Sequence, residues 1–234
     1  MKPFLSIIIP AYNESGRIGG TLSAVHNFLS TKGYIYEIIV VNDGSNDSTT
    51  EIVRKASEHI PEIRLLALQE NEGKGAAVKA GMLAAKGDVR LFMDADNSTS
   101  IEHVEELLPY LQDGYDVAIG SRRIEGAIIL VTQSPIREAL GACFRFIAHF
   151  LIPLDIKDTQ NGFKLFSRNS SELLFKDLRT KGWGFDVEIL SRAQKLGLRI
   201  KEVPIVWMND GRSKMRFSHM IRIITDLCLI KFTA

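Results

Sequence analysis

Cysteine is scarce in this sequence, with only two among 234 residues. Cys143 and Cys228 both lie in apolar, periodic segments, where a cysteine serves as a small hydrophobic side chain, so a disulfide framework is not expected and a reducing compartment fits. An excess of one charge is lacking too, because 29 basic residues face 28 acidic ones and the formal net charge is +1. We therefore expect no nucleic-acid partner.

Long hydrophobic runs are also missing. No uncharged stretch reaches the 18 residues of a membrane-spanning helix. The N-terminal "MKPFLSIIIP" meets Pro10 after one short apolar run, which is not the pattern of a signal peptide. The sequence thus predicts neither a transmembrane span nor a leader. Its length is that of one large domain, which can bury its core without disulfides or structural metals.

Short runs rich in Ile and Val alternate with amphipathic stretches, which is typical of βαβ units around a mainly parallel sheet. Strands are expected at 4–11, 36–43, 63–69, 89–96 and 116–122. Helices are expected near 14–31, 47–58, 73–86 and 100–112, each opened by a residue that favours a helix start, such as Ser15, Asp47 and Ser100. We predict a single α/β domain over 1–234, whose character changes after about residue 121.

In an open parallel sheet, ligands bind beyond the carboxyl ends of the strands. Polar side chains collect at these ends: Tyr12, Asp43, Asn71, Asp94 and Asp96. The last two belong to "LFMDADNSTS", in which a buried strand runs into two carboxylates. Two interpretations of this stretch are open. It is either a solvated turn with a helix cap or a site for a hard divalent cation, Mg²⁺ or Mn²⁺, completed by water and phosphate oxygens.

Four ordered motifs, "IIIPAYNES", "VVNDGSNDST", "NEGKGAAVKAG" and "DAD", resemble those of the family 2 glycosyltransferases over nearly the whole chain. The resemblance implies a GT-A type fold, which is a Rossmann-like, mainly parallel sheet flanked by helices. It makes 1–121 the nucleotide-sugar-binding half and 122–234 the acceptor half. The nucleotide-sugar site that it implies consists of Pro10, Ala11, Tyr12, Glu14, Asp43, Lys74, Asp94, Ala95, Asp96, Ser213 and Lys214.

Individual roles in that site follow from the resemblance. Tyr12 would lie near the base and Glu14 near the ribose, while Asp43 would accept from the base edge, with a local turn in "NDGS" as its structural alternative. Lys74 stands between two glycines that allow close backbone approach. Asp96, with Asp94, would hold the metal beside the donor diphosphate.

Four segments of the acceptor half are "GSRRIEG", "SPIREALG", "DTQNGFKLFSR" and "GWGFDVEIL". Together they resemble the polyprenyl-phosphate sugar transferases, and most closely the dolichyl-phosphate glucosyltransferase branch. Arg122, Arg137 and Asp186 would form the acceptor phosphate site, since an arginine fork suits phosphate. The catalytic set would be Asp94, Asp96, Asp158, Gln160 and Lys214. An acceptor that is already a phosphate needs no strong general base. Ser213 and Lys214 would cover the diphosphate as a lid.

Two amphipathic segments, about 137–152 and 215–232, carry apolar residues at helical spacing, with His149 and His219 on their polar faces. Core-packing helices would explain them, but we favour helices that lie in the membrane interface. The prediction is then a peripheral protein at the cytoplasmic face of a membrane, with room for a separate membrane protein as partner. Since some relatives continue into transmembrane helices, the chain is either a peripheral form or truncated.

The predicted reaction is inverting transfer of a hexose to a polyprenyl or dolichyl phosphate, assisted by Mg²⁺ or Mn²⁺. UDP-glucose is the expected donor. GDP-mannose as donor, or a hydroxyl group as acceptor, are the alternatives, because pocket shape decides base and sugar and the motifs do not resolve it.

Overall fold

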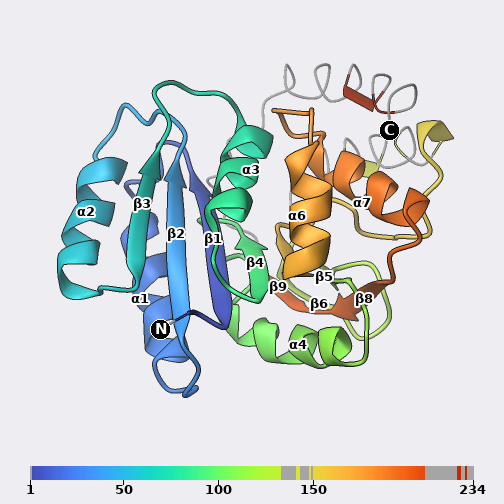
Figure 1. Ribbon diagram of the computed structural model, residues 1–234, viewed down its shortest axis with the longest axis horizontal. Coiled ribbons are helices and arrows are strands. Elements are labelled where there is room, and N and C mark those ends of the chain that lie inside the picture. The colour runs from blue at the N-terminus through green and yellow to red at the C-terminus, as the bar shows by residue number, and fades with distance from the viewer. Residues whose placement is uncertain are drawn as a thin grey trace.

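The computed structural model describes residues 2–132, 141–142, 148, 150–208, 226–227 and 230. These residues form three layers, with one central sheet between two groups of helices (Figure 1). Five of the seven central strands are buried along nearly all of their length because helices cover both faces, and runs such as "LSIIIPA" and "VRLFM" are therefore almost wholly apolar.

Seven strands form the central sheet in the order β3-β2-β1-β4-β7-β5-β8. Their bounds are β1 Leu5–Ala11, β2 Tyr36–Asn42, β3 Ile63–Ala67, β4 Val89–Met93, β5 Val117–Ser121, β7 Phe163–Ser167 and β8 Ile200–Pro204. All five predicted strands are present. Strand β7 runs antiparallel to both of its neighbours, β4 and β5, and the other pairs in the sheet are parallel.

The helices divide between the two faces of the sheet. One core cluster packs α1, α2 and α4 against the sheet, and the other packs α3, α6 and α7. The bounds are α1 Ile18–Leu29, α2 Thr49–His59, α3 Lys74–Ala84, η1 Ile101–His103, α4 Val104–Gln112, α6 Arg168–Lys176 and α7 Phe185–Lys195. The first helix begins later than predicted, because Glu14 opens a turn in which its carbonyl oxygen accepts from the N–H groups of Arg17 and Ile18.

A second, two-stranded parallel sheet lies beside the first and consists of β6 Ile128–Val131 and β9 Val206–Met208. Strand β9 is tied to the loop that follows β4. Thr99 forms a bridge with Trp207, and Met208 N donates to Ser98 O at 2.9 Å. This connection joins the end of the "DAD" segment to the acceptor half of the chain.

The two predicted amphipathic helices, with Cys143, Cys228, His149 and His219, fall largely outside the described residues. Leu227, an apolar residue of the second segment, is fully buried in the core cluster that contains α3 and α7. Phe150, by contrast, is 76% exposed. Within the described part of the chain, no helix is both long and apolar enough to cross a membrane.

Candidate active site

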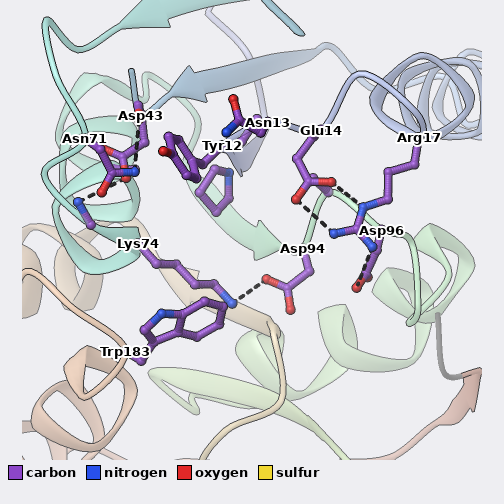
Figure 2. Close-up of a pocket in the computed structure, with 15 residues that line it drawn as sticks. Tyr12, Asn13, Glu14, Arg17, Asp43, Asn71, Lys74, Asp94, Asp96 and Trp183 are labelled. Carbon is purple, nitrogen blue, oxygen red and sulfur yellow. Dashed lines mark hydrogen bonds and ion pairs between the residues drawn. The ribbon is translucent and has the colours of Figure 1, made fainter. Parts of the chain in front are cut away.

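A cavity of about 630 Å³ opens at the carboxyl ends of β1, β2 and β4. Every described residue that we predicted for the nucleotide sugar lines it, because parallel strands deliver their ends to one edge of the sheet. The full lining is Pro10, Ala11, Tyr12, Asn13, Glu14, Arg17, Asp43, Asn71, Gly73, Lys74, Ala77, Asp94, Ala95, Asp96 and Trp183. Figure 2 shows Asp43 and Asn71 at one end of the cavity and Arg17 and Asp96 at the other, with Lys74 and Asp94 between them.

Asp43 closes one end of the cavity and holds the turn that leads into α3. Its carboxylate accepts from the backbone N–H of Glu72 at 2.8 Å and of Gly73 at 3.0 Å. Burial raises the pKa of Asp43 above its ordinary value, although these two N–H groups act in the opposite direction. The local turn in "NDGS" is made by Asn42, whose side-chain oxygen accepts from Ser45 N at 3.1 Å. Asp43 therefore has lone pairs left for a ligand, as its predicted role requires.

The two glycines around Lys74 allow a close backbone approach, as we expected. A Cβ on Gly73, whose φ is +107°, would overlap the carbonyl oxygen of Lys181, and one on Gly75 would overlap that of Thr180. The close backbone approach is therefore between α3 and the 180–182 segment of the same chain. It sets the start of α3, and with it Lys74, against the acceptor half.

Lys74 lies at the centre of the cavity wall. Its ammonium group is 2.6 Å from Asp94 Oδ1 and lies over the rings of Trp183 and Phe92, at 4.9 and 5.3 Å from their centroids. Burial disfavours the charged form, but the surrounding carboxylates, Asp94 first, raise the pKa of Lys74 above its ordinary value. The residue is therefore a fixed positive charge beside the first carboxylate of "DAD".

Asp94 owes its position to a glycine in the acceptor half. Its N–H donates to Gly162 O at 3.0 Å, and a Cβ on Gly162 would overlap the Asp94 carboxylate. Sequence reasoning did not find Gly162, although it lies within the quoted "DTQNGF". Only the insertion of β7 next to β4 brings the two segments together.

Asp96 has features of both a turn and a cation site, the two interpretations of the "DAD" stretch. Its Oδ1 accepts from Ser98 N at 3.0 Å, as in a turn, and Asn97 between them has φ +53°. Burial, followed by the charge of Asp94, raises the pKa of Asp96 above its ordinary value. A buried carboxylate whose ionisation is disfavoured by a neighbouring carboxylate is a place where a cation is stabilising.

A divalent metal fits the residues present at this point. Asp94 and Asp96 offer hard oxygen ligands of the kind that Mg²⁺ and Mn²⁺ prefer. Among the described residues, no group of three or more His, Cys, Asp or Glu is placed to hold a metal. Two carboxylates with the other coordination positions left to further oxygen ligands are a donor set that Mg²⁺ accepts.

Arg17 is a charged cavity residue that the sequence motifs did not identify. Its Nη2 donates to Glu14 Oε1 at 2.9 Å and its Nε donates to Glu14 Oε2, so that Glu14 holds the guanidinium by two bonds. Its Nη1 lies 3.9 Å from Asp96 Oδ2. The motif "YNES" pointed to Glu14 and not to Arg17. The position of Arg17 depends on the turn that leads into α1, which brings the Arg17 side chain toward Asp96 beyond the end of β4.

Two more ion pairs lie outside the cavity lining, and each contains one residue predicted for the acceptor phosphate, Arg122 or Asp186. The Arg122 guanidinium donates to the Asp158 carboxylate from Nε at 2.7 Å and from Nη2 at 2.8 Å. The backbone N–H of Arg122 donates to the same carboxylate at 2.9 Å. Lys164 Nζ lies 2.5 Å from Asp186 Oδ1. Both carboxylates are buried and neither lines the cavity. Although burial opposes ionisation, the Arg122 guanidinium holds the pKa of Asp158 below its ordinary value.

The remaining predicted residues of the acceptor half are less informative. Glu188, two residues after Asp186, accepts from the backbone N–H groups of Arg179 and Thr180 at 2.9 and 2.8 Å, and so fixes the segment against which α3 packs. Gln160 lies in the turn before β7, next to buried neighbours, without lining the cavity. Arg137, Ser213 and Lys214 lie outside the described residues.

Comparison with known proteins decides the family. Residues 6–175 match the family described as Glycosyl transferase family 2, which is well over half of the chain. The chain belongs to this family. The resemblance predicted from the four motifs is therefore confirmed, and the chain is a sugar-transferring enzyme.

Several relatives of this family 2 glycosyltransferase carry the same enzyme name. The proteins named dolichyl-phosphate beta-glucosyltransferase from Trichomonas vaginalis, Saccharomyces cerevisiae and Homo sapiens are 40%, 37% and 32% identical to it. Each alignment covers 97% of this chain, and the chain spans 70%, 74% and 74% of these relatives.

Solved structures confirm the predicted GT-A type fold of this family 2 glycosyltransferase. A glucosyl-3-phosphoglycerate synthase from Mycobacterium tuberculosis, in complex with Mn²⁺, UDP-glucose and phosphoglyceric acid, superposes with a TM-score of 0.74 at 19% identity, over 99% of this chain and 81% of that one. A mannosyl-3-phosphoglycerate synthase from Rubrobacter xylanophilus gives 0.72 at 18% identity, over 97% and 72%. At this low sequence identity, the structural similarity establishes the fold alone.

Proposed function

We propose that this glycosyltransferase moves glucose from UDP-glucose to dolichyl phosphate or another polyprenyl phosphate, with inversion at the sugar carbon and the help of Mg²⁺ or Mn²⁺. The names of its relatives support the acceptor and the sugar. The observation that carries the proposal is that Asp158, the carboxylate of "DTQNGF", is buried and paired with Arg122.

Transfer to a hydroxyl group requires a carboxylate that can take a proton from the acceptor. Asp158 is poorly suited to this task, because it is 1% exposed and held by three hydrogen bonds from Arg122. Its lowered pKa makes it a weaker base still. A phosphate monoester is already ionised near neutral pH and needs no such base. The arrangement favours a phosphate acceptor over a hydroxyl acceptor, with Asp158 orienting groups and not removing a proton.

The donor would lie along the cavity. Its volume of about 630 Å³ is within the range of small-molecule sites. The ring of Tyr12, 37% exposed at the cavity wall, offers a surface for the base, and Asp43 offers acceptor lone pairs to its N–H group. Glu14 would face the ribose, as the family motif implies, with a carboxylate that the ribose shares with Arg17. The diphosphate would then reach Lys74 and the two carboxylates of "DAD".

The metal would be held by Asp96 and Asp94. When bound, it neutralises the negative charge that the leaving nucleotide diphosphate accumulates as the glycosidic bond breaks. The residues of the chain supply the rest of this environment. Lys74 adds a fixed positive charge, Ser98 N–H orients Asp96, and the absence of a Cβ at Gly162 gives Asp94 its space.

The acceptor phosphate would approach from the side of β7 and β9. Arg122 lies there with its guanidinium 5.1 Å from the centroid of the Trp207 ring, and Asp186 lies beneath with Lys164. Arg122, Arg137 and Asp186 keep their predicted acceptor role in this proposal, and Gln160, Ser213 and Lys214 keep their catalytic and covering roles. A lipid-linked acceptor also requires a membrane surface. We place the enzyme at the cytoplasmic face as a peripheral protein, with or without a membrane protein as partner.

The test is a matrix of labelled donors and acceptors. UDP-glucose and GDP-mannose are each offered with a short polyprenyl phosphate and with the matching polyprenol, in Mn²⁺ and in EDTA. The proposal expects label in the lipid only for UDP-glucose with the phosphate and metal. Transfer from GDP-mannose would assign the enzyme to mannose instead, and transfer to the polyprenol would overturn the argument from Asp158.

A further inference from the structure

Each carboxylate of the "DAD" segment faces a cation of its own. Lys74 Nζ lies 2.6 Å from Asp94, and Arg17 Nη1 lies 3.9 Å from Asp96 (Figure 2). Each of the two carboxylates that would bind a dication thus has a positive charge of the protein beside it, and Arg17 shares its charge between Asp96 and Glu14. Glu14 lies on the far side of Arg17, where its carboxylate is occupied by the guanidinium.

Arg17 is not a loose surface side chain. Its side chain is only 12% exposed, and two of its nitrogens are fixed on Glu14. Glu14 is fixed in turn, because its backbone N–H donates to Thr49 Oγ1 at 2.7 Å and its carbonyl oxygen starts the first turn of α1. This scaffold directs the positive charge at Asp96 in the protein without ligands.

A dication that approaches Asp96 alone therefore meets a positive charge beside its ligand. A nucleotide diphosphate changes this balance, because its negative charges attract both Arg17 and Lys74 and release the carboxylates for the metal. We propose that Arg17 makes metal binding at Asp96 dependent on the donor diphosphate, so that metal and nucleotide bind cooperatively. This inference rests on the proposed function, since it takes a nucleotide diphosphate as the donor.

Such coupling is reciprocal: the factor by which the nucleotide strengthens metal binding equals the factor by which the metal strengthens nucleotide binding. Both factors can be measured without turnover. The residue acts through Asp96, so Arg17 is a positioning residue whose signature is this coupling factor and not the reaction rate.

The experiment measures Mn²⁺ affinity from the electron paramagnetic resonance signal of free Mn²⁺, with and without UDP. Arg17→Gln should strengthen Mn²⁺ binding without nucleotide by about tenfold, because a unit charge acting on a dication across roughly 6 Å in a water-like dielectric corresponds to that factor. Binding in the presence of UDP should change little, so the coupling factor should fall by about tenfold. Calorimetric titration of UDP with and without Mn²⁺ should give the same fall.

Two further variants and a control complete the design. Arg17→Met is a second neutral variant that keeps the aliphatic stem in case glutamine disturbs the fold, and Arg17→Lys should retain coupling within about threefold because it keeps the charge. Arg168→Gln removes an equal charge at the Asp88 pair, outside the cavity, and should change nothing. A thermal melt of each variant checks the fold.

Unchanged or weaker Mn²⁺ affinity in both neutral variants would overturn the inference, as would an unchanged coupling factor. The proposed function fails in a different way. If the unaltered protein binds neither UDP nor GDP, the donor assignment is wrong and the inference falls with it. If nucleotide binds and supports transfer but Arg17→Gln leaves the coupling intact, only the inference falls.

Discussion

Replacement of Arg122 by glutamine should destabilise the protein, because it leaves the Asp158 carboxylate buried without its counter-ion. The variant loses both side-chain bonds to Asp158, at 2.7 and 2.8 Å, and keeps only the backbone N–H of residue 122. Removing one partner of a buried ion pair costs about 3–5 kcal/mol. For a chain of this size the melting temperature should fall by about 10 °C.

The pH dependence of this loss identifies its cause. Asp158 has a folded pKa below its ordinary value, so its contribution to stability is complete above about pH 4, the pKa of an unfolded aspartate, and is lost as pH falls through the folded pKa. In the variant the guanidinium no longer offsets burial, so the pKa of Asp158 should rise. The difference in melting temperature between the two proteins should therefore be largest at about pH 8 and narrow as the pH falls.

Thermal melts at a series of pH values, followed by circular dichroism, measure both effects. Arg123→Gln is the matched control, because the neighbouring Arg123 is exposed and should give a shift within about 0.5 kcal/mol. Arg122→Lys should fall between the two, with a loss of about 1.5–3 kcal/mol, since an ammonium cannot reproduce the fork. A difference that persists unchanged to pH 3, or a normal melt for Arg122→Gln, would refute the reasoning.

Three shorter predictions concern the neighbouring residues. Asp96→Ala should abolish most transfer and leave the melt unchanged, since a carboxylate beyond a strand end adds little to the core; near-normal turnover in EDTA would contradict its role. Gly162→Ala should reduce turnover by about tenfold or more by displacing the Asp94 carboxylate, and a fully active variant would show that this position is not needed. Asp186→Ala should cost about 3–5 kcal/mol in chemical denaturation by leaving Lys164 buried without its partner, whereas Asp186→Ala with Lys164→Met should recover part of that loss; equal stability of the single and double variants would disprove the pairing argument.

The donor end of the site could be predicted because it depends on strand ends. Asp43, Asp94 and Asp96 each follow an apolar run, and parallel strands bring such ends to one edge whatever their separation along the chain. The two faces of the sheet are buried, so the runs themselves are easily recognised. The strand positions and five of the cavity residues followed from this rule, and the family resemblance supplied the other predicted ones. The five are Tyr12, Asp43, Asn71, Asp94 and Asp96.

The partners of these residues could not be predicted in the same way. Gly162 lies far from Asp94 in the sequence and meets it only because β7 inserts antiparallel between β4 and β5. Arg17 approaches Asp96 through the first turn of α1, whose start was predicted at residue 14 and lies at Ile18. Side-chain pairing of this kind depends on three-dimensional placement, which periodicity does not encode.

Charged residues of the acceptor half illustrate a second limit. Arg122 and Asp186 were predicted as contacts for a phosphate, and the structure gives each of them a buried partner of its own, Asp158 and Lys164. A motif records that a charge is present but not which of its neighbours it faces. An arginine whose fork already holds a carboxylate can reach a phosphate only with other nitrogens or by exchange.

The central claim is tested most directly by the mass of the lipid product. Purified protein is incubated with UDP-glucose, a short polyprenyl phosphate and Mn²⁺, and the extracted lipid is analysed by mass spectrometry beside a reaction with Asp96→Ala. We predict a gain of one hexose and no additional phosphate, absent in the variant and in EDTA. A lipid that remains unmodified, or one that gains a sugar phosphate, would contradict the account.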